Sequence, residues 1–187
     1  MAAPAEPGTV SGAGRFARRM VRAALLRSDL YEEVEADRGA TGQAFAVVVL
    51  AAVATGIGAI GNSGPMGILW HTLVDVAGWY AWAFTTCEIG TRLLPTHETR
   101  ADLGELLRTL GFASAPGVLR IGGLLDEAAF ALFTVCTLWM LIAMVVAVRQ
   151  ALDYRSTPRA LAVCAIGLPV YAVPQMLSVL VLGPWPL

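Results

Sequence analysis

The sequence has little charge and no lysine. Charged residues make up 14% of its 187 residues and hydrophobic residues 57%, whereas soluble domains usually carry about 25% charged residues. A chain of this composition has too little polar surface to cover a water-soluble globule, so we expect it to lie in a membrane. All 13 basic residues are arginine, which together with abundant Ala, Gly and Val hints at a GC-rich bacterial genome.

Cysteine is equally scarce. Cys87, Cys136 and Cys164 each lie within an apolar block, and no two of them form a C-x-x-C pair. Their odd number and spacing argue against a disulfide framework or a thiolate metal site. We therefore interpret them as small apolar residues.

Motifs of known catalytic chemistry are missing. The sequence contains no H-E-x-x-H, no G-x-S-x-G and no Cys/His spacing typical of a metal site. Its two histidines, His71 and His97, are expected on opposite sides of the membrane, so they cannot share one ion. The sequence thus predicts a protein that is not an enzyme and that uses neither a cofactor nor a metal.

One string imitates a nucleotide-binding motif. Residues Gly56 to Gly61 read G-x-G-x-x-G, but the dinucleotide fingerprint requires a strand before the glycines and a helix that begins at them. Here the glycines end a long apolar run. They predict a small-residue surface against which a neighbouring helix packs.

Long apolar runs are what the sequence does have. Each is about 17 to 25 residues long, which is the length needed to cross roughly 30 Å of hydrocarbon as a helix. Because backbone groups in lipid must be paired within the segment, the runs predict an all-α bundle of five transmembrane helices. We place this membrane domain at residues 41–187, with spans at about 43–60, 67–89, 106–125, 128–148 and 160–182.

The connections between these runs carry turn and cap residues. Gly61 to Pro65 predicts a tight turn after the first span, and Asp126-Glu127 marks the connection before the fourth. Thr99-x-x-Asp102 resembles a capping box that would open the third helix. The third span also contains Pro116 and several glycines, so we expect it to be kinked or partly re-entrant.

The first 40 residues differ from the rest. Residues Met1 to Gly14 are rich in Ala, Pro, Gly and Ser, and we expect a disordered tail. From Arg15 to Arg38 the pattern predicts one amphipathic helix, basic in its first half and acidic in its second. An arginine-rich helix just before a span is typical of a lipid-surface element, so we expect contact with the lipid bilayer and not with nucleic acid.

The arginines also predict an orientation. The N-terminal segment carries six of them, and the connections after the second and fourth spans carry three each. By the positive-inside rule the N-terminus is cytoplasmic and the C-terminus lies outside, which is the periplasm for a bacterial inner membrane. Trp70 and Trp185 would then lie in the outer aromatic belt.

Ionisable residues inside the spans are candidates for a structural or functional role, because burying a charge in a bilayer is costly. Glu88 lies four residues before Arg92, a spacing that favours an ion pair on a helix. Asp75 and Arg120 fall at similar depths on consecutive spans, and we predict that they pair, with His71 as an alternative partner for Asp75. A structural clamp, an unpaired Arg120 that extends to the interface, and a polar transport or catalytic site remain open.

Three stretches resemble a known family. They are Leu110 to Pro116, Trp139 to Tyr154, and Ser156 to Ala160, and they are similar to the bacterial branch of the Ypt/Rab-interacting (YIP) membrane-protein family. Asp29-Leu30-Tyr31 resembles an Asp-Leu-Tyr element of its eukaryotic members. The resemblance implies five spans and a cytosolic N-terminus. Eukaryotic relatives engage small GTPases in vesicle trafficking, a role that we do not carry over to a bacterium.

The leading hypothesis is a non-enzymatic scaffold or adaptor of the inner membrane. Its N-terminal helix and cytosolic loops would contact lipid headgroups or a membrane or cytosolic protein partner, and self-association is left open. The alternative is a small-solute permease or transporter subunit with a polar site around His71, Asp75 and Arg120.

Overall fold

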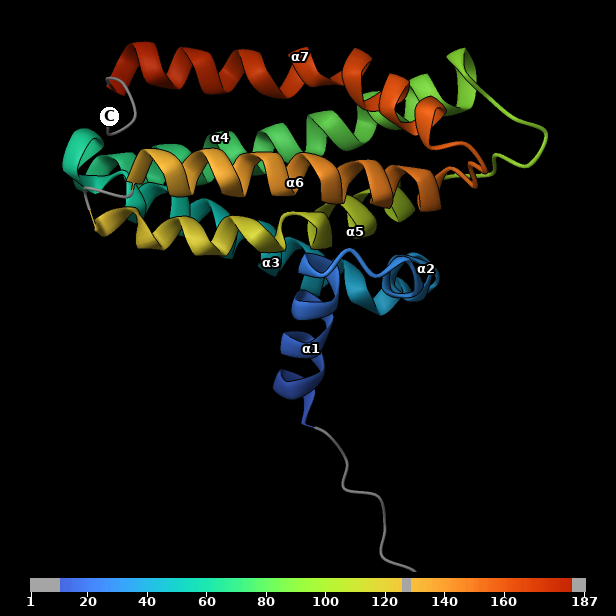
Figure 1. Cartoon of the computed structure of the whole chain (residues 1–187), viewed down its shortest axis with the longest axis horizontal. Coiled ribbons are helices and arrows are strands. Elements are labelled where there is room, and N and C mark those ends of the chain that lie inside the picture. Colours follow the sequence, from blue (N-terminus) through green and yellow to red (C-terminus); the bar gives the residue numbers. More distant parts are fainter. Residues whose placement is uncertain (1–10, 126–128, 183–187) are drawn as a thin grey trace, which may run out of the picture.

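The computed structural model describes residues 11–125 and 129–182, and in these ranges the chain is helical and contains no strand. The long helices run side by side along a common direction, and α1 projects away from them (Figure 1). In chain order the elements are α1 (Gly12–Ala24), α2 (Ser28–Ala36), η1 (Arg38–Ala40), α3 (Thr41–Gly58), α4 (Ile60–Glu88), η2 (Ile89–Leu93), α5 (Leu103–Ala113), η3 (Ala115–Leu124), α6 (Ala129–Ala151) and α7 (Thr157–Leu182).

Three helices of the described chain are long and apolar enough to cross a membrane. They are Arg38–Gly58, Ala129–Ala151 and Thr157–Ser178, which correspond to the first, fourth and fifth expected spans. Helix α4 has the length but carries His71, Thr72 and Asp75 near its middle. Residues 1–10, 126–128 and 183–187 lie outside the described ranges. The expected connection at Asp126-Glu127 and the expected position of Trp185 in the aromatic belt fall on these residues.

The third expected span is not one continuous helix. Helix α5 ends at Ala113, and after Ser114 the chain continues as the 3-10 helix η3. Pro116 lacks the amide hydrogen that an α-helical ladder would need, so the change of helix type at this point follows from the sequence. Helix α5 opens with a capping box between Asp102 and Glu105. The box expected at Thr99 was therefore placed three residues too early.

The N-terminal segment forms two helices, so the single helix expected over residues 15–38 is wrong. Leu26 adopts a φ of 58° between α1 and α2, which no α-helix accommodates. Residues 12–14, expected in the tail, already belong to α1, whose N-terminus is capped by Ser11. Helix α2 packs on the bundle through Leu30, Tyr31 and Val34, all fully buried. The two short helices are thus a structured part of the protein.

The expected turn at Gly61 to Pro65 is reduced to one residue. Gly64 has a φ of 63° and a ψ of −176°, and the helical path resumes at Pro65. A positive φ is accessible to glycine at little cost, and proline suits the first turn of a helix. Only Ala59 separates the end of α3 from the start of α4.

Glycines allow α3 to approach its neighbours closely, as the G-x-G-x-x-G string predicts. A Cβ on Gly56 would lie 2.5 Å from Cα of Ile68, and one on Gly58 would lie 2.1 Å from the carbonyl oxygen of Arg120. A Cβ on Gly61, by contrast, would meet nothing within 4 Å. The packing role is confirmed for the first two glycines. The cysteines are free thiols, with Cys136 and Cys164 buried and Cys87 half-buried.

Replacement of Gly58 by Ala should destabilise the protein because the new methyl group meets backbone that cannot move aside. Overpacking of this kind costs about 1–3 kcal/mol. Gly61→Ala is the matched control, and it should be neutral or stabilising by up to about 1 kcal/mol because alanine favours the helix. Thermal unfolding in detergent would measure both, and equal midpoints would contradict the packing role of Gly58.

Candidate functional site

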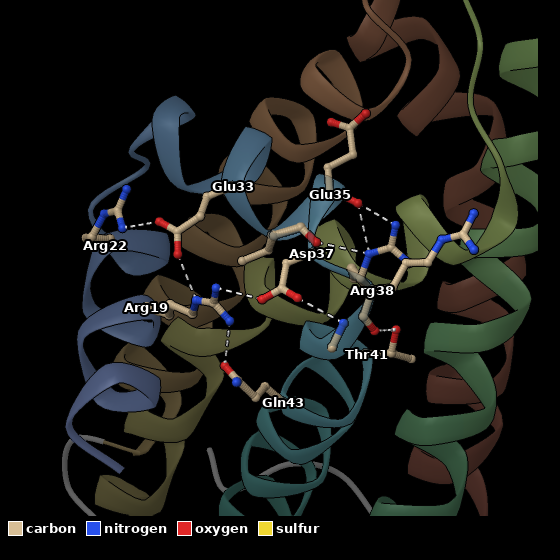
Figure 2. A network of polar contacts seen from close by, with 11 residues as sticks. Arg19, Arg22, Glu33, Glu35, Asp37, Arg38, Thr41 and Gln43 are labelled. Carbon is tan, nitrogen blue, oxygen red and sulfur yellow. Dashed lines mark hydrogen bonds and ion pairs between the residues drawn. The ribbon is translucent and has the colours of Figure 1, made fainter. Parts of the chain in front are cut away.

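The charged residues of the N-terminal segment form one network between α1, α2 and α3. Arg19 donates to Glu33 at 2.9 Å, to Asp37 at 2.9 Å and to Gln43 at 3.0 Å. Figure 2 shows its guanidinium pointing into the angle between the three helices. The neighbouring Arg22 also binds Glu33 and reaches Asp29. The basic half of the segment is therefore largely neutralised by the acidic half.

The network changes the acidity of its carboxyl groups. The hydrogen bond from Arg19 holds the pKa of Asp37 below its ordinary value. The hydrogen bonds from Arg27 and Arg22 do the same for the pKa of Asp29. A depressed carboxyl pKa means that the bonds stabilise the fold above about pH 4 and are lost as the pH falls below it.

A second arginine holds α2 from the opposite side. Arg108 of α5 is buried and donates through Nε to the carbonyl oxygens of Val34, at 3.0 Å, and Glu35, at 3.1 Å. These are carbonyls of the last turn of α2, where a cation compensates both the unpaired oxygens and the helix dipole. Trp139 of α6 donates in the same way to the carbonyl of Ala24, near the end of α1.

The side chain of Glu35 lies in a less favourable environment. Burial, followed by the charges of Glu105 and Asp153, raises its pKa to about 7. Arg108 acts in the opposite direction but with a smaller effect. Ionised Glu35 therefore opposes folding near neutral pH.

The loop end of the bundle carries a charged groove, which we call the charged end and define as residues 97–100 and 149–155. The groove has a volume of about 610 Å³ and is lined by His97, Glu98, Arg100, Arg149, Gln150, Asp153, Tyr154 and Arg155. An ion pair between Arg155 and Glu98 joins its two loops. Tyr154, which also lines the groove, donates to the carbonyl oxygen of Leu94 at 2.8 Å and so joins the two loops a second time. An adjoining cavity of about 280 Å³ adds Arg159 to the basic rim.

Inside the bundle, Asp75 is bound by α7. Its Oδ1 accepts hydrogen bonds from Gln175 Nε2 and, at 3.4 Å, from the Tyr171 hydroxyl. Both donors lie on one face of α7, four residues apart. The Asp75 carboxylate is therefore directed at the fifth helix of the bundle rather than at the segment that carries Arg120.

Arg120 is bound by hydroxyl groups. It donates to Thr137 Oγ1 at 2.7 Å and to Thr55 Oγ1 at 3.3 Å, and it lies over the Phe133 ring. Among the described residues no ion pair joins Asp75 and Arg120 directly, although their opposite charges attract each other at longer range. The predicted pairing is therefore not made as a direct contact. Both side chains line one small interior cavity, with a volume of about 20 Å³.

The other predicted residues have different outcomes. His71 is buried and does not line the small cavity that Asp75 and Arg120 share, but the charge of Arg120 acts on it. A polar site of His71, Asp75 and Arg120 therefore stays a prediction. The Glu88–Arg92 pair is present, at 2.8 Å, on the exposed end of α4. Such an exposed pair contributes at most about 1 kcal/mol.

Sequence reasoning missed the residues that bind the interior charges. Thr55, Thr137, Tyr171 and Gln175 are polar positions in otherwise apolar helices. The spacing of Tyr171 and Gln175, one helical turn apart, was the available signal, because it places two donors on one face.

In the described ranges these features define an all-helical protein with three helices long and apolar enough to cross a membrane, a charged end and a polar cluster in its interior. No group of three His, Cys, Asp or Glu side chains in the described ranges is arranged to hold a metal ion. No family model, curated protein or solved structure matches the chain.

Replacement of Glu35 by Gln should remove a pH dependence of stability. Between pH 4.5, the ordinary pKa, and about 7 the folded state retains a proton that the unfolded state releases, so parent stability should fall as the pH rises through this window. Above pH 7 the variant should be more stable by about 1–2 kcal/mol, a figure reduced for partial exposure. Unfolding measured from pH 4 to 8 tests this, with exposed Glu32→Gln on the same helix as control. A variant with the parent's pH profile would contradict it.

Proposed function

We propose that this chain is a non-enzymatic scaffold or adaptor with five transmembrane segments, similar in kind to the bacterial branch of the YIP family. The observation that carries the proposal is the attachment of α1 and α2 to the bundle. Arg19 of α1 and Arg108 of α5 form hydrogen bonds with residues in or next to α2. Leu30, Tyr31 and Val34 of α2 are fully buried. An ordered module of this kind beside a basic groove is a surface for binding partners.

The side chains of α4 support its assignment as a membrane span. Leu69, Leu73, Tyr80 and Phe84 are each about half exposed, and their spacing of four, seven and four residues aligns them along one face. His71 and Asp75 are buried. This division, with an apolar face outward and polar groups inward, is what a helix beside lipid requires. Exposed Leu119 and Ile121 give η3 a similar outer surface.

Helix α1 has the features of a helix lying in the plane of the membrane surface. It projects away from the bundle (Figure 1), with Arg19 and Arg22 turned to the carboxylates of α2. Val21 and Leu25 are 58% and 64% exposed, in one stripe with the exposed Arg18. An amphipathic helix in this position buries its apolar face at the boundary between headgroups and acyl chains.

The groove of the charged end is suited to an acidic segment of a cytosolic protein. Three arginines and His97 line it against only Glu98 and Asp153, so its charge is complementary to an acidic peptide. Transport of a solute fits less well. The cavity shared by Asp75 and Arg120, about 20 Å³, has room for roughly one water molecule.

Cysteine labelling should separate five spans from three. In a background with the native cysteines replaced by Ala, Met66→Cys should react with an impermeant maleimide in intact spheroplasts, whereas Ser156→Cys should react only after lysis. Both topologies predict these two controls. His97→Cys decides: protection until lysis supports five spans, whereas labelling together with Met66→Cys would leave only α3, α6 and α7 as spans. Reversal of both controls would reverse the orientation.

Photocrosslinking from the groove tests the scaffold function. A photoreactive amino acid in place of His97 should crosslink, in cells, to an acidic segment of a cytosolic protein. Arg100→Glu combined with Arg155→Glu should reduce the crosslink more than about tenfold because like charges then face each other. Arg92→Glu, outside the groove, is the matched control and should leave it unchanged.

Two results would count against the scaffold function. One is a crosslink that is insensitive to charge reversal, and the other is a crosslink only to lipid or to a second copy of this chain. Point variants are preferable to removal of residues 1–38, because that deletion would uncover the bundle surface under Leu30, Tyr31 and Val34.

A further inference from the structure

A crevice separates α6 from α7 on the side of the bundle away from the charged end. Its volume is about 390 Å³, which falls within the range typical of small-molecule sites. Its walls are largely apolar, with Phe130, Phe133, Leu138, Leu141 and Leu168 prominent among them. Thr137, Gln175 and Arg120 add polar groups to this apolar space.

Arg120 is the unusual member of this lining. The residue is only 8% exposed, and its Nε has no hydrogen-bond partner among the described residues. Its other two nitrogens donate to neutral hydroxyl groups, among them those of Thr55 and Thr137. In the described part of the chain no carboxylate lies within ion-pair distance of it.

The two other buried arginines show how this protein compensates such a charge. Arg19 binds two carboxylates, and Arg108 binds the carbonyls at the end of a helix. A buried guanidinium is unfavourable unless an anion compensates its charge at close range. Asp75 attracts Arg120 only from beyond ion-pair distance, and its Oδ1 accepts from Gln175 and Tyr171.

We propose that the crevice between α6 and α7 binds an anionic amphiphile. A carboxylate or phosphate head would lie against the guanidinium of Arg120, a group that favours such anions. The acyl chain would lie along Phe130, Leu138, Leu141 and Leu168. This site is separate from the groove of the charged end, so it does not depend on the scaffold function.

Binding to the purified full-length protein in nonionic detergent tests the site. Palmitate and hexadecyl phosphate should each bind more than about tenfold tighter than hexadecanol, which has the same chain without the charge. Native mass spectrometry or a ligand-induced rise in Tm would report the difference. Preference for palmitate over palmitoyl-lysophosphatidylglycerol would assign the head to a free fatty acid, and the reverse preference to an anionic phospholipid; either result supports the anionic head.

Two variants locate the binding. Arg120→Gln removes the charge and should abolish the preference for palmitate over hexadecanol. Ala172→Phe fills the crevice from an exposed position on α7, keeps Arg120 and should reduce palmitate affinity about tenfold or more. Val173→Phe adds the same ring one residue away, outside the crevice lining, and should bind normally.

Two outcomes would overturn the proposal: equal binding of palmitate and hexadecanol by the parent protein, or normal palmitate binding by Ala172→Phe. Because residue 172 is exposed, the second variant remains informative if Arg120→Gln fails to fold.

Discussion

A guanidinium group that leaves water must find oxygen atoms to replace it, and three buried arginines meet this requirement in three ways. Arg19 uses carboxylates, Arg108 uses the carbonyls at the end of α2, and Arg120 uses two hydroxyls. All three solutions join separate elements, because each arginine lies on one element and its acceptors lie on others. Much of the arrangement outside the apolar core follows from these bonds.

The position of α1 illustrates the consequence. Arg19 fixes the angle between α1 and α2, while Arg108 fixes α2 on the bundle. Apolar packing places α2 through Leu30 and Tyr31 and also holds α1 through Ala23, Phe16 and Met20, and the ion pairs act in addition to it. They also explain why a strongly basic segment leaves only part of its charge for other partners.

The sequence predicted what depends on local pattern and failed where distant segments meet. Apolar runs located the long helices, spacing located the Glu88–Arg92 pair, and small residues located the close contacts of Gly56 and Gly58. Position along the spans predicted that Asp75 and Arg120 lie at a similar depth. It could not predict in which direction around its helix each side chain points. That direction is set by α7, about 100 residues further along the chain, whose Tyr171 and Gln175 bind Asp75.

Arg120 differs from the other two arginines in a way that links the interior to the lipid-facing side. It lines both the small cavity shared with Asp75 and the crevice between α6 and α7, and Tyr171 does the same. An anion on Arg120 would therefore lie beside the residues that already bind Asp75. Arg120 and Tyr171 thus join the polar cluster of the interior to the crevice between α6 and α7.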